Sequence, residues 1–250
     1  MGNKNINCCV VIPVYKANPG LNEFLSFQQC LRVLYKHPVL IVAPENLNTE
    51  FYEQAAKGDL QIIRFNDTYF KDLAGYNRLM LSTRFYERFI EYKYMLLYQL
   101  DAWIFRDELE YWCNKDYDYI GSPWVGHSWA GFAAAHYSFV RTLLYKIGYR
   151  DFNLVGNGGF SLRKVKSVLI NLHFFKKKAE NFNRNEDAFF SFYINSYNPF
   201  FKIPSLKTAL DFGFDINPEQ SFHLNNNRLP MGCHAWEKNY SFWDQFIPTA

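Results

Sequence analysis

The stretch "LLYQLDAWIF" places a single carboxylate, Asp101, between two apolar arms. A strand that is buried on both faces is typically a nearly continuous apolar run, and this stretch has that character. A bare carboxylate in or beside such a run is costly to remove from water. Two interpretations follow: Asp101 pairs with a cation, or it is a capping or turn acid at the end of the strand.

The other side chains suited to chemistry come late in the chain. Glu186 and Asp187 are adjacent, and His234 precedes Lys238 by four positions. A carboxylate and an imidazole can together hold a divalent metal ion, and a lysine suits a phosphate. Each residue also has a simpler interpretation. The two adjacent acids can serve only a helix dipole, and the histidine can be bonded to backbone groups.

Composition excludes several classes of protein. Of the 250 residues, 49% are hydrophobic and 20% aromatic, so the chain is not disordered, and a net charge of +3 is too small for a typical nucleic-acid-binding protein. The five cysteines form no CxxC pair, which indicates neither a zinc site nor a disulfide framework.

No apolar run approaches the ~20 residues that cross a bilayer, so we expect any membrane contact to be peripheral. The first strand leaves no room for a signal peptide. We therefore expect a cytoplasmic location, at most at the inner face of the membrane.

The elements that must position these residues alternate in type. We expect strands at 7–15, 37–44, 60–65 and 96–105, and helices at 21–35, 48–56 and about 74–92. This alternation predicts an α/β fold with a mostly parallel central sheet flanked by helices, in a single domain. Ligands of such sheets bind beyond the carboxyl ends of the strands, where we place Asp101.

The second half of the chain is less regular. We expect a strand and tight turn at 116–124, a glycine-rich turn and strand at 156–165, and a helix that begins near Asn185. Residues 223–243 show little periodicity. The chain lacks the GxxxxGK[ST], GxGxxG, GxSxG and HExxH motifs, so the common nucleotide-loop, hydrolase and metalloprotease sites are not indicated.

The order of these motifs resembles that of the GT-A-type glycosyltransferases. More closely, the chain resembles a bacterial glycosyltransferase-like family with the motifs "QLDAWIF", "DYIGSPW", "GNGGFSLR", "NED" and "GCHAWEKN". The resemblance runs from "VVIPVY" at 10–15 to "HAWEKNYSFW" at 234–243. It implies one GT-A-like domain over residues 1–250, in which 1–105 bind the nucleotide sugar and 106–250 bind the acceptor and carry catalysis.

The resemblance implies a metal and donor site. GT-A enzymes carry a DxD motif whose last acid holds a divalent ion on the donor's diphosphate. Here the motif is Gln99-Leu100-Asp101, with an amide in place of the first acid. His234 corresponds to a C-terminal histidine that completes the metal site, so Mn²⁺ or Mg²⁺ is the implied cofactor, and Lys238 corresponds to lysines that touch the diphosphate. The segment that holds the nucleotide base corresponds to Pro13, Val14 and Tyr15.

On the acceptor side, the resemblance implies that Asp187 is the general base of an inverting reaction. At the start of a helix, the positive end of the dipole is expected to lower the pKa of this carboxyl. Glu186 points about 100° away around the helix and is not an easy substitute.

Other residues are implied to lie near the sugar and the acceptor. By position in the family motifs these are Gly158, Gly159 and Glu186. Two tryptophans, Trp124 and Trp236, are added on their own chemistry, because the faces of aromatic rings pack against pyranose rings. The simpler interpretation is that both belong to the core, as most rings must in a chain this aromatic.

The implied activity is metal-dependent, inverting transfer of a hexose from a nucleotide sugar, UDP-linked, to a glycan or lipid-linked glycan. The expected partners are that donor and acceptor, and not nucleic acid. Two alternatives remain open. A sugar nucleotidyltransferase also uses a metal and acids, but it needs a basic glycine-rich loop after the first strand, and "PVYKANPG" is a poor match. A non-catalytic glycan-binding module would account for the missing first acid of the DxD motif.

Overall fold

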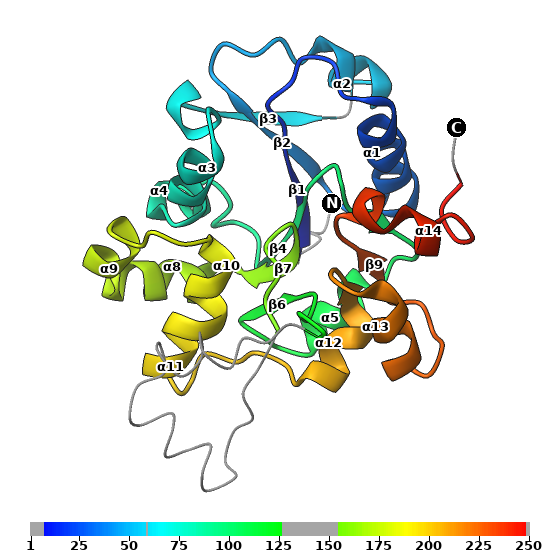
Figure 1. Cartoon of the computed structure of the whole chain (residues 1–250). Coiled ribbons are helices and arrows are strands. Elements are labelled where there is room, and N and C mark those ends of the chain that lie inside the picture. The colour runs from blue at the N-terminus through cyan, green and yellow to red at the C-terminus, as the bar shows by residue number, and fades with distance from the viewer. Residues whose placement is uncertain (1–7, 59, 127–154, 249–250) are drawn as a thin grey trace, which may run out of the picture.

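The computed structural model describes residues 8–58, 60–126 and 155–248, with a six-stranded sheet at its centre (Figure 1). The strand order is β3-β2-β1-β4-β7-β6. These strands are β1 (Cys8–Pro13), β2 (Val39–Pro44), β3 (Gln61–Phe65), β4 (Tyr94–Tyr98), β6 (Tyr119–Gly121) and β7 (Phe160–Lys164).

Four of these strands run parallel, as the sequence predicts. β1 pairs in parallel with β2 and β4, and β2 pairs in parallel with β3, whereas β7 runs antiparallel between β4 and β6. The carboxyl ends of β1 and β4 therefore lie at one edge of the sheet. Because β7 is antiparallel, it begins at that same edge, where Phe160 pairs with Tyr98.

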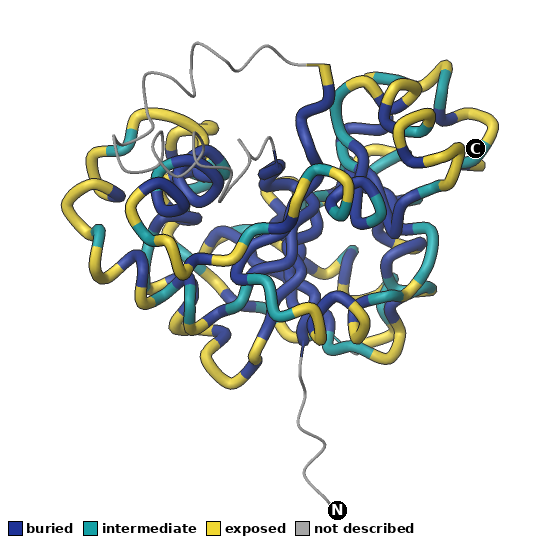
Figure 2. The backbone as a smooth tube through the Cα atoms, turned by 90° about the horizontal axis from the view of Figure 1, so that it is seen from below, coloured by how far each residue is buried: buried dark blue, intermediate teal, exposed yellow. Residues whose placement is uncertain are grey.

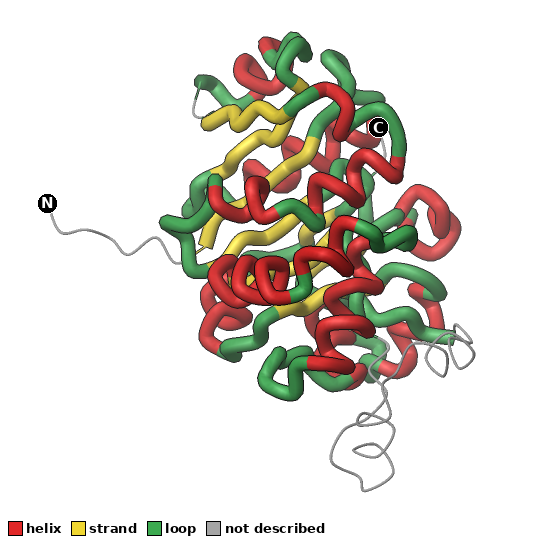
Figure 3. The backbone as a smooth tube through the Cα atoms, turned by 90° about the vertical axis from the view of Figure 1, so that its left-hand side faces the viewer, coloured by secondary structure: helices red, strands yellow, loops and turns green. Residues whose placement is uncertain are grey.

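Helices cover both faces of this sheet, and side chains of β1 alternate between two cores. Val10 and Ile12 join one buried cluster, and Cys9 and Val11 join the other. The first cluster lies under α1 (Leu21–Val33), α2 (Glu50–Ala55) and α5 (Leu109–Asn114). The second lies under α3 (Leu73–Met80), α4 (Thr83–Glu87) and α8 (Val165–Phe174). The strands accordingly form the buried centre of the molecule (Figures 2 and 3).

A second, three-stranded sheet has the order β5-β9-β8, and its strands are β5 (Trp103–Ile104), β9 (Gly232–Cys233) and β8 (Gly213–Phe214). It packs with a separate aromatic core that includes Trp236 and Trp243. The elements around it are α12 (Leu206–Phe212), α13 (Pro218–Leu224), η3 (Trp236–Asn239) and α14 (Tyr240–Trp243).

The remaining elements lie on the periphery or lead toward the sheet edge. They are η1 (Asp67–Tyr69), α9 (Lys176–Glu180), α10 (Glu186–Ala188), the π-helix η2 (Phe189–Ile194) and α11 (Asn195–Tyr197). No helix within the described ranges is long and apolar enough to span a bilayer.

Two predicted elements are divided in the structure. The strand predicted at 96–105 is interrupted after Tyr98 by a turn, in which the amide of Ala102 donates to the carbonyl of Gln99 at 2.9 Å. The chain turns there because Trp103 leaves the central sheet to pair with Cys233.

The helix predicted at about 74–92 is likewise two helices. α3 ends at Met80, and Ser82, with extended backbone angles, is the N-cap of α4. Serine favours such cap positions over helix interiors, which explains why the break falls there.

The close approach of β6 to the glycine-rich turn gives a stability prediction. A Cβ atom on Gly121 would lie 2.2 Å from the carbonyl oxygen of Asn157, whereas one on Gly20 would meet only Glu23, at 3.5 Å. Gly121→Ala should therefore lower the free energy of unfolding in urea by about 1–3 kcal/mol, the usual cost of overpacking. Gly20→Ala, the control, should cost less than about 1 kcal/mol. Equal losses in the two variants would contradict the tight packing.

Candidate active site

A cleft of about 800 Å³ opens at the carboxyl edge of the central sheet. Its lining includes the segments that follow β1 and β4 and the first turns of α1 and α3. Five of the predicted donor-binding residues line it: Pro13, Val14, Tyr15, Gln99 and Asp101. The structure thus brings together, in one cleft, residues from two distant parts of the sequence.

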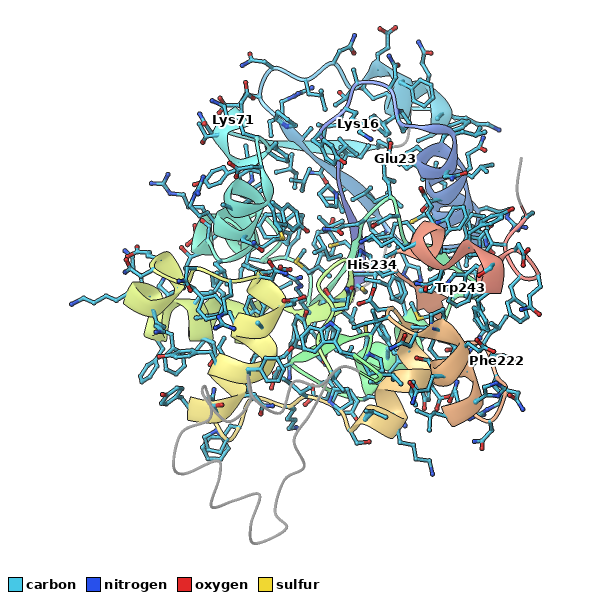
Figure 4. All side chains as sticks on the ribbon, in the orientation of Figure 1. Lys16, Glu23, Lys71, Phe222, His234 and Trp243 are labelled. Atoms are coloured by element: carbon cyan, nitrogen blue, oxygen red, sulfur yellow. The ribbon has the colours of Figure 1, made fainter. Side chains whose placement is uncertain are left out.

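The walls of this cleft carry an exposed aromatic ring and several charges. The Tyr15 side chain is 60% exposed, and the Lys16 ammonium lies 2.8 Å from the Glu23 carboxylate. Figure 4 shows Lys16 and Glu23 side by side, with Lys71 on the opposite side of the strand ends; all three line the cleft. Rings and cations of this kind suit a planar base and a phosphate chain.

The second sheet determines which residues meet at the end of β4. Trp103 pairs with Cys233 in the antiparallel register of β5 and β9, so His234, the next residue, lies beside Asp101. β8 pairs in parallel with β9, and the amide of His234 donates to the carbonyl of Phe214 at 2.9 Å. Each of the three short strands therefore places one polar residue at the site. Asp101 precedes β5, His234 follows β9, and Asp215 follows β8.

His234 lies between two carboxylates. Its Nε2 is 3.1 Å from Asp101 Oδ1 and 3.1 Å from Gln99 Oε1, and its Nδ1 is 3.1 Å from Asp215 Oδ1. Asp101 and His234 are thus in contact, as their predicted metal-binding roles require, and Gln99 joins them. Asp215 was not predicted. The sequence pattern that could have indicated it is the same as for Asp101, an acid beside a short apolar run.

These contacts decide the charge of the histidine. Burial lowers the pKa of His234, but the hydrogen bonds to Asp101 and Asp215 outweigh that effect and raise it to about 10. Burial is the largest single effect and would raise the pKa of Asp101, but the bond to His234, the charge of that ring and smaller contributions together lower it. At neutral pH and without a metal, the ring is therefore a cation that is hydrogen-bonded to Asp101 and Asp215.

The geometry fits a divalent ion in place of the Nε2 proton. Asp101 Oδ1 and Gln99 Oε1 each lie 3.1 Å from His234 Nε2, so the three atoms are close enough to share one ion. Two neighbouring ligands about 2.1 Å from a metal stand about 3.0 Å apart, close to the 3.1 Å between Asp101 and His234. Asp215 accepts the Nδ1 proton, which leaves Nε2 free to coordinate.

Across the described ranges, no group of three or more His, Cys, Asp or Glu side chains is arranged to hold a metal. Donor phosphates and water would have to complete the shell of an ion at this position.

The glycine-rich turn closes the site from the β7 side. A Cβ on Gly159 would lie 2.1 Å from His234 Nε2 and 2.5 Å from Gln99 Oε1, so no side chain fits there. The amide of Gln99 donates to the carbonyl of Gly159 at 2.8 Å. Asn157 accepts from the amide of Gly159 at 2.9 Å and donates to Asp215 at 3.0 Å, which joins the turn to the histidine's partner.

A buried ion pair supports this turn. The guanidinium of Arg163, fully buried, donates to Glu186 at 2.8 Å, to the hydroxyl of Tyr86 at 2.7 Å and to the carbonyl of Gly158 at 3.2 Å. Glu186, predicted to contact the acceptor, is 4% exposed and turned toward Arg163. Sequence reasoning missed Arg163, although a lone arginine at an inward-facing position of a strand was a usable signal.

Asp187 lies next to this pair, and the prediction of a lowered pKa is wrong. Burial, and then repulsion from Glu186, raise the pKa of Asp187 well above its usual range. The hydrogen bond from the amide of Ala188 and the charge of Arg163 oppose this only in part. Asp187 lies in the first turn of a helical segment, but burial outweighs the effect of the helix dipole on its pKa. The raised pKa makes Asp187 a stronger base than an ordinary carboxylate.

Of the remaining predicted residues, Lys238 is exposed on η3 and its charge helps to lower the pKa of Asp101. The two tryptophans are buried. Trp124 is 5% exposed and stacks on Phe192, with ring centroids 5.5 Å apart. Trp236 has no exposed surface and packs against Trp103, so its predicted contact with a sugar is not supported.

The fold is that of the GT-A-type glycosyltransferases. Mouse xyloside xylosyltransferase 1, in its apo form, superposes with a TM-score of 0.52 at 10% identity, covering 92% of this chain and 97% of that one. The apo WbbM bifunctional glycosyltransferase gives 0.51 at 10% identity, over 94% of this chain and 46% of that one. At such identities the likeness establishes the fold.

The chain belongs to the family described as "Protein of unknown function (DUF5672)", whose model matches residues 59–234. The match includes the strand-end acid, the glycine-rich turn, Asp215 and His234. A search of curated proteins gave no match.

The charge of His234 gives a pH prediction for the protein kept in a chelator. Because folding raises the pKa of His234 from 6.5 to about 10, the stabilisation is complete below about pH 6.5 and is lost as the pH rises to about 10. Urea unfolding should show wild type more stable than His234→Gln at neutral pH, with the difference shrinking toward pH ~10. His223→Gln, at an exposed histidine, is the control. A difference that stays constant over this range would contradict the assignment.

Proposed function

We propose that this protein transfers a hexose from a nucleotide sugar, UDP-linked, to a glycan or lipid-linked glycan. The observation that carries the proposal is the convergence of Asp101, Gln99 and His234 at the edge of the cleft. The glycosyltransferase fold supports it, as do the activities of the two similar proteins, a xyloside xylosyltransferase and a bifunctional glycosyltransferase. In this proposal residues 1–105 bind the donor, and residues 106–250 bind the acceptor and contribute catalysis.

The charges at the site suit a departing nucleoside diphosphate. Asp101 and His234 would hold Mn²⁺ or Mg²⁺, with Gln99 beside them, and a bound ion would supply positive charge to the diphosphate. Lys238, exposed on the same side, would place a second cation near those phosphates. Pro13, Val14 and Tyr15 would face the base in the cleft.

Asp187 is proposed to accept the proton of the acceptor hydroxyl. Its raised pKa favours that role, since a base works best when its pKa approaches the working pH. Arg163 holds Glu186 away from the reacting groups, so one carboxylate of the "NED" pair is left for proton transfer. A single dedicated base implies direct displacement with inversion, and the anomeric configuration of the product tests that step.

Product analysis separates this proposal from its alternatives. Incubation with UDP-sugars, Mn²⁺ and candidate glycans should release UDP only when an acceptor is present. Formation of UDP-sugar from UTP and a sugar 1-phosphate would instead indicate a nucleotidyltransferase. Glycan binding without turnover of any donor would indicate a binding module.

Loss of the strand-end acid should weaken nucleotide binding through the metal. Asp101→Ala should reduce Mn²⁺-dependent UDP affinity by about 1–3 kcal/mol, the scale for losing a charged hydrogen-bonding partner. Isothermal calorimetry with and without Mn²⁺ measures this. Glu237→Ala removes an exposed acid from the same cleft and should leave the metal dependence intact. If wild type binds UDP equally well with and without Mn²⁺, the assignment of Asp101 as a metal ligand is wrong.

Removal of the proposed base should stop turnover and leave donor binding. Asp187→Asn should lower kcat about 10²–10⁴-fold, the usual worth of a positioned base. Because the pKa of Asp187 is raised, the wild-type rate should increase with pH through a pKa above the ordinary carboxyl range. Asp211→Asn, at a half-exposed acid, is the control. Full activity of Asp187→Asn would refute the role.

A further inference from the structure

The outer face of α8 carries apolar and basic side chains in one stripe. Lys166, Ile170, His173 and Phe174 are all exposed and follow the spacing of a single helix face. Ile170 is 67% exposed and Phe174 is 80% exposed. The opposite face of the helix is buried in the core, so this stripe is an additional apolar surface that the fold does not use.

Two residues at and just after the end of α11 extend the stripe. Tyr197 is 51% exposed and Phe200 is 84% exposed. The two segments are adjacent: the side-chain Nδ2 of Asn198 donates to the side-chain oxygen of Asn171 at 2.9 Å, and the rings of Phe175 and Tyr197 lie 6.3 Å apart. We define the α8/α11 patch as Ile170, Phe174, Tyr197 and Phe200.

Positive charge surrounds this patch. The segment 164–178 contains five lysines and no acid. The acids that pair with these lysines include Glu180, 3.9 Å from Lys176, and Asp116, which pairs with both Lys164 and Lys202. Within the part of the chain that the structure describes, Lys166 and Lys177 have no acid at ion-pair distance, so the surface keeps a net positive charge.

We propose that the α8/α11 patch binds an anionic lipid bilayer. Exposed aromatic and aliphatic side chains on a helix, flanked by lysines, match the chemistry of an interface with acyl chains below and anionic headgroups around. The charge favours this occupant over a second copy of the chain, because two identical lysine-rich faces would repel each other. Single exposed apolar residues are common on protein surfaces, but four on two neighbouring segments are less so.

Such a contact would place the candidate site close to the membrane. α10, η2 and α11 form one helical segment from Glu186 to Tyr197, so about 15 Å at most separates Asp187 from the patch. A glycan attached to a lipid would then reach the site while its lipid part stays in the bilayer. This consequence rests on the proposed function, whereas the membrane binding itself does not.

Vesicle sedimentation tests the proposal without any donor or turnover. The full chain should sediment with vesicles of phosphatidylglycerol and phosphatidylcholine, and far less with phosphatidylcholine alone, and added salt should weaken binding. Lys176→Ala with Lys177→Ala should lower the partition coefficient at least about tenfold, and Phe174→Ser with Phe200→Ser by a similar factor.

The matched control combines Tyr35→Ser with Lys36→Glu, an exposed aromatic and lysine pair on another face, and should bind as wild type does. Circular dichroism checks that every variant is folded. Equal binding to both kinds of vesicle, or unchanged binding of the patch variants, would overturn the proposal. So would a dimer, seen by light scattering, that Phe174→Ser with Phe200→Ser abolishes, because the patch would then bind a second copy.

Discussion

The pairing of Trp103 with Cys233 is the contact on which the candidate site depends. Asp101 lies just before one of these short strands and His234 directly after the other, so this register sets the distance between them. Two residue pairs form a very short ladder. The ladder is stable because Trp103 and Cys233 are buried in an aromatic core with Trp236 and Trp243. The tryptophans of this region therefore stabilise the β5–β9 pairing that positions the site residues.

A second constraint is the fully buried charge of Arg163. A guanidinium without water is tolerated only when its donors are satisfied, and here they reach Glu186, Tyr86 and backbone oxygen. These partners come from α10, α4 and the glycine-rich turn. Arg163 thus links the segment that carries Asp187 to the glycine-rich turn that packs against His234. Removing this side chain would leave the carboxylate of Glu186 buried and unpaired.

Periodicity and composition were enough to predict the α/β class, the parallel strands and the position of Asp101 at a strand end. Alternation and apolar runs are local signals, and the core of the central sheet follows them directly. The meeting of Asp101 with His234 was also predicted, but from the order of motifs and not from any local pattern.

What the sequence did not reveal depends on contacts between distant segments. Asp215 owes its place to the β8–β9 register, and Arg163 is a partner only because α10 folds over β7. The pKa of Asp187 was predicted with the wrong sign, because burial is a property of the assembled fold and outweighed the local helix dipole. Trp236 was predicted to contact the sugar because of its chemistry, whereas in the structure its ring fills the aromatic core next to the three-stranded sheet.

The wide separation of the site residues has a consequence for the order in which the protein is made. Gln99 and His234 are 135 positions apart in the sequence, yet their side chains lie 3.1 Å apart. The four parallel strands can pair once β4 has left the ribosome, but the histidine and its short strand follow only much later. Closing so long a loop is slow compared with local pairing. The segments that line most of the cleft are therefore made well before His234, which completes the candidate site.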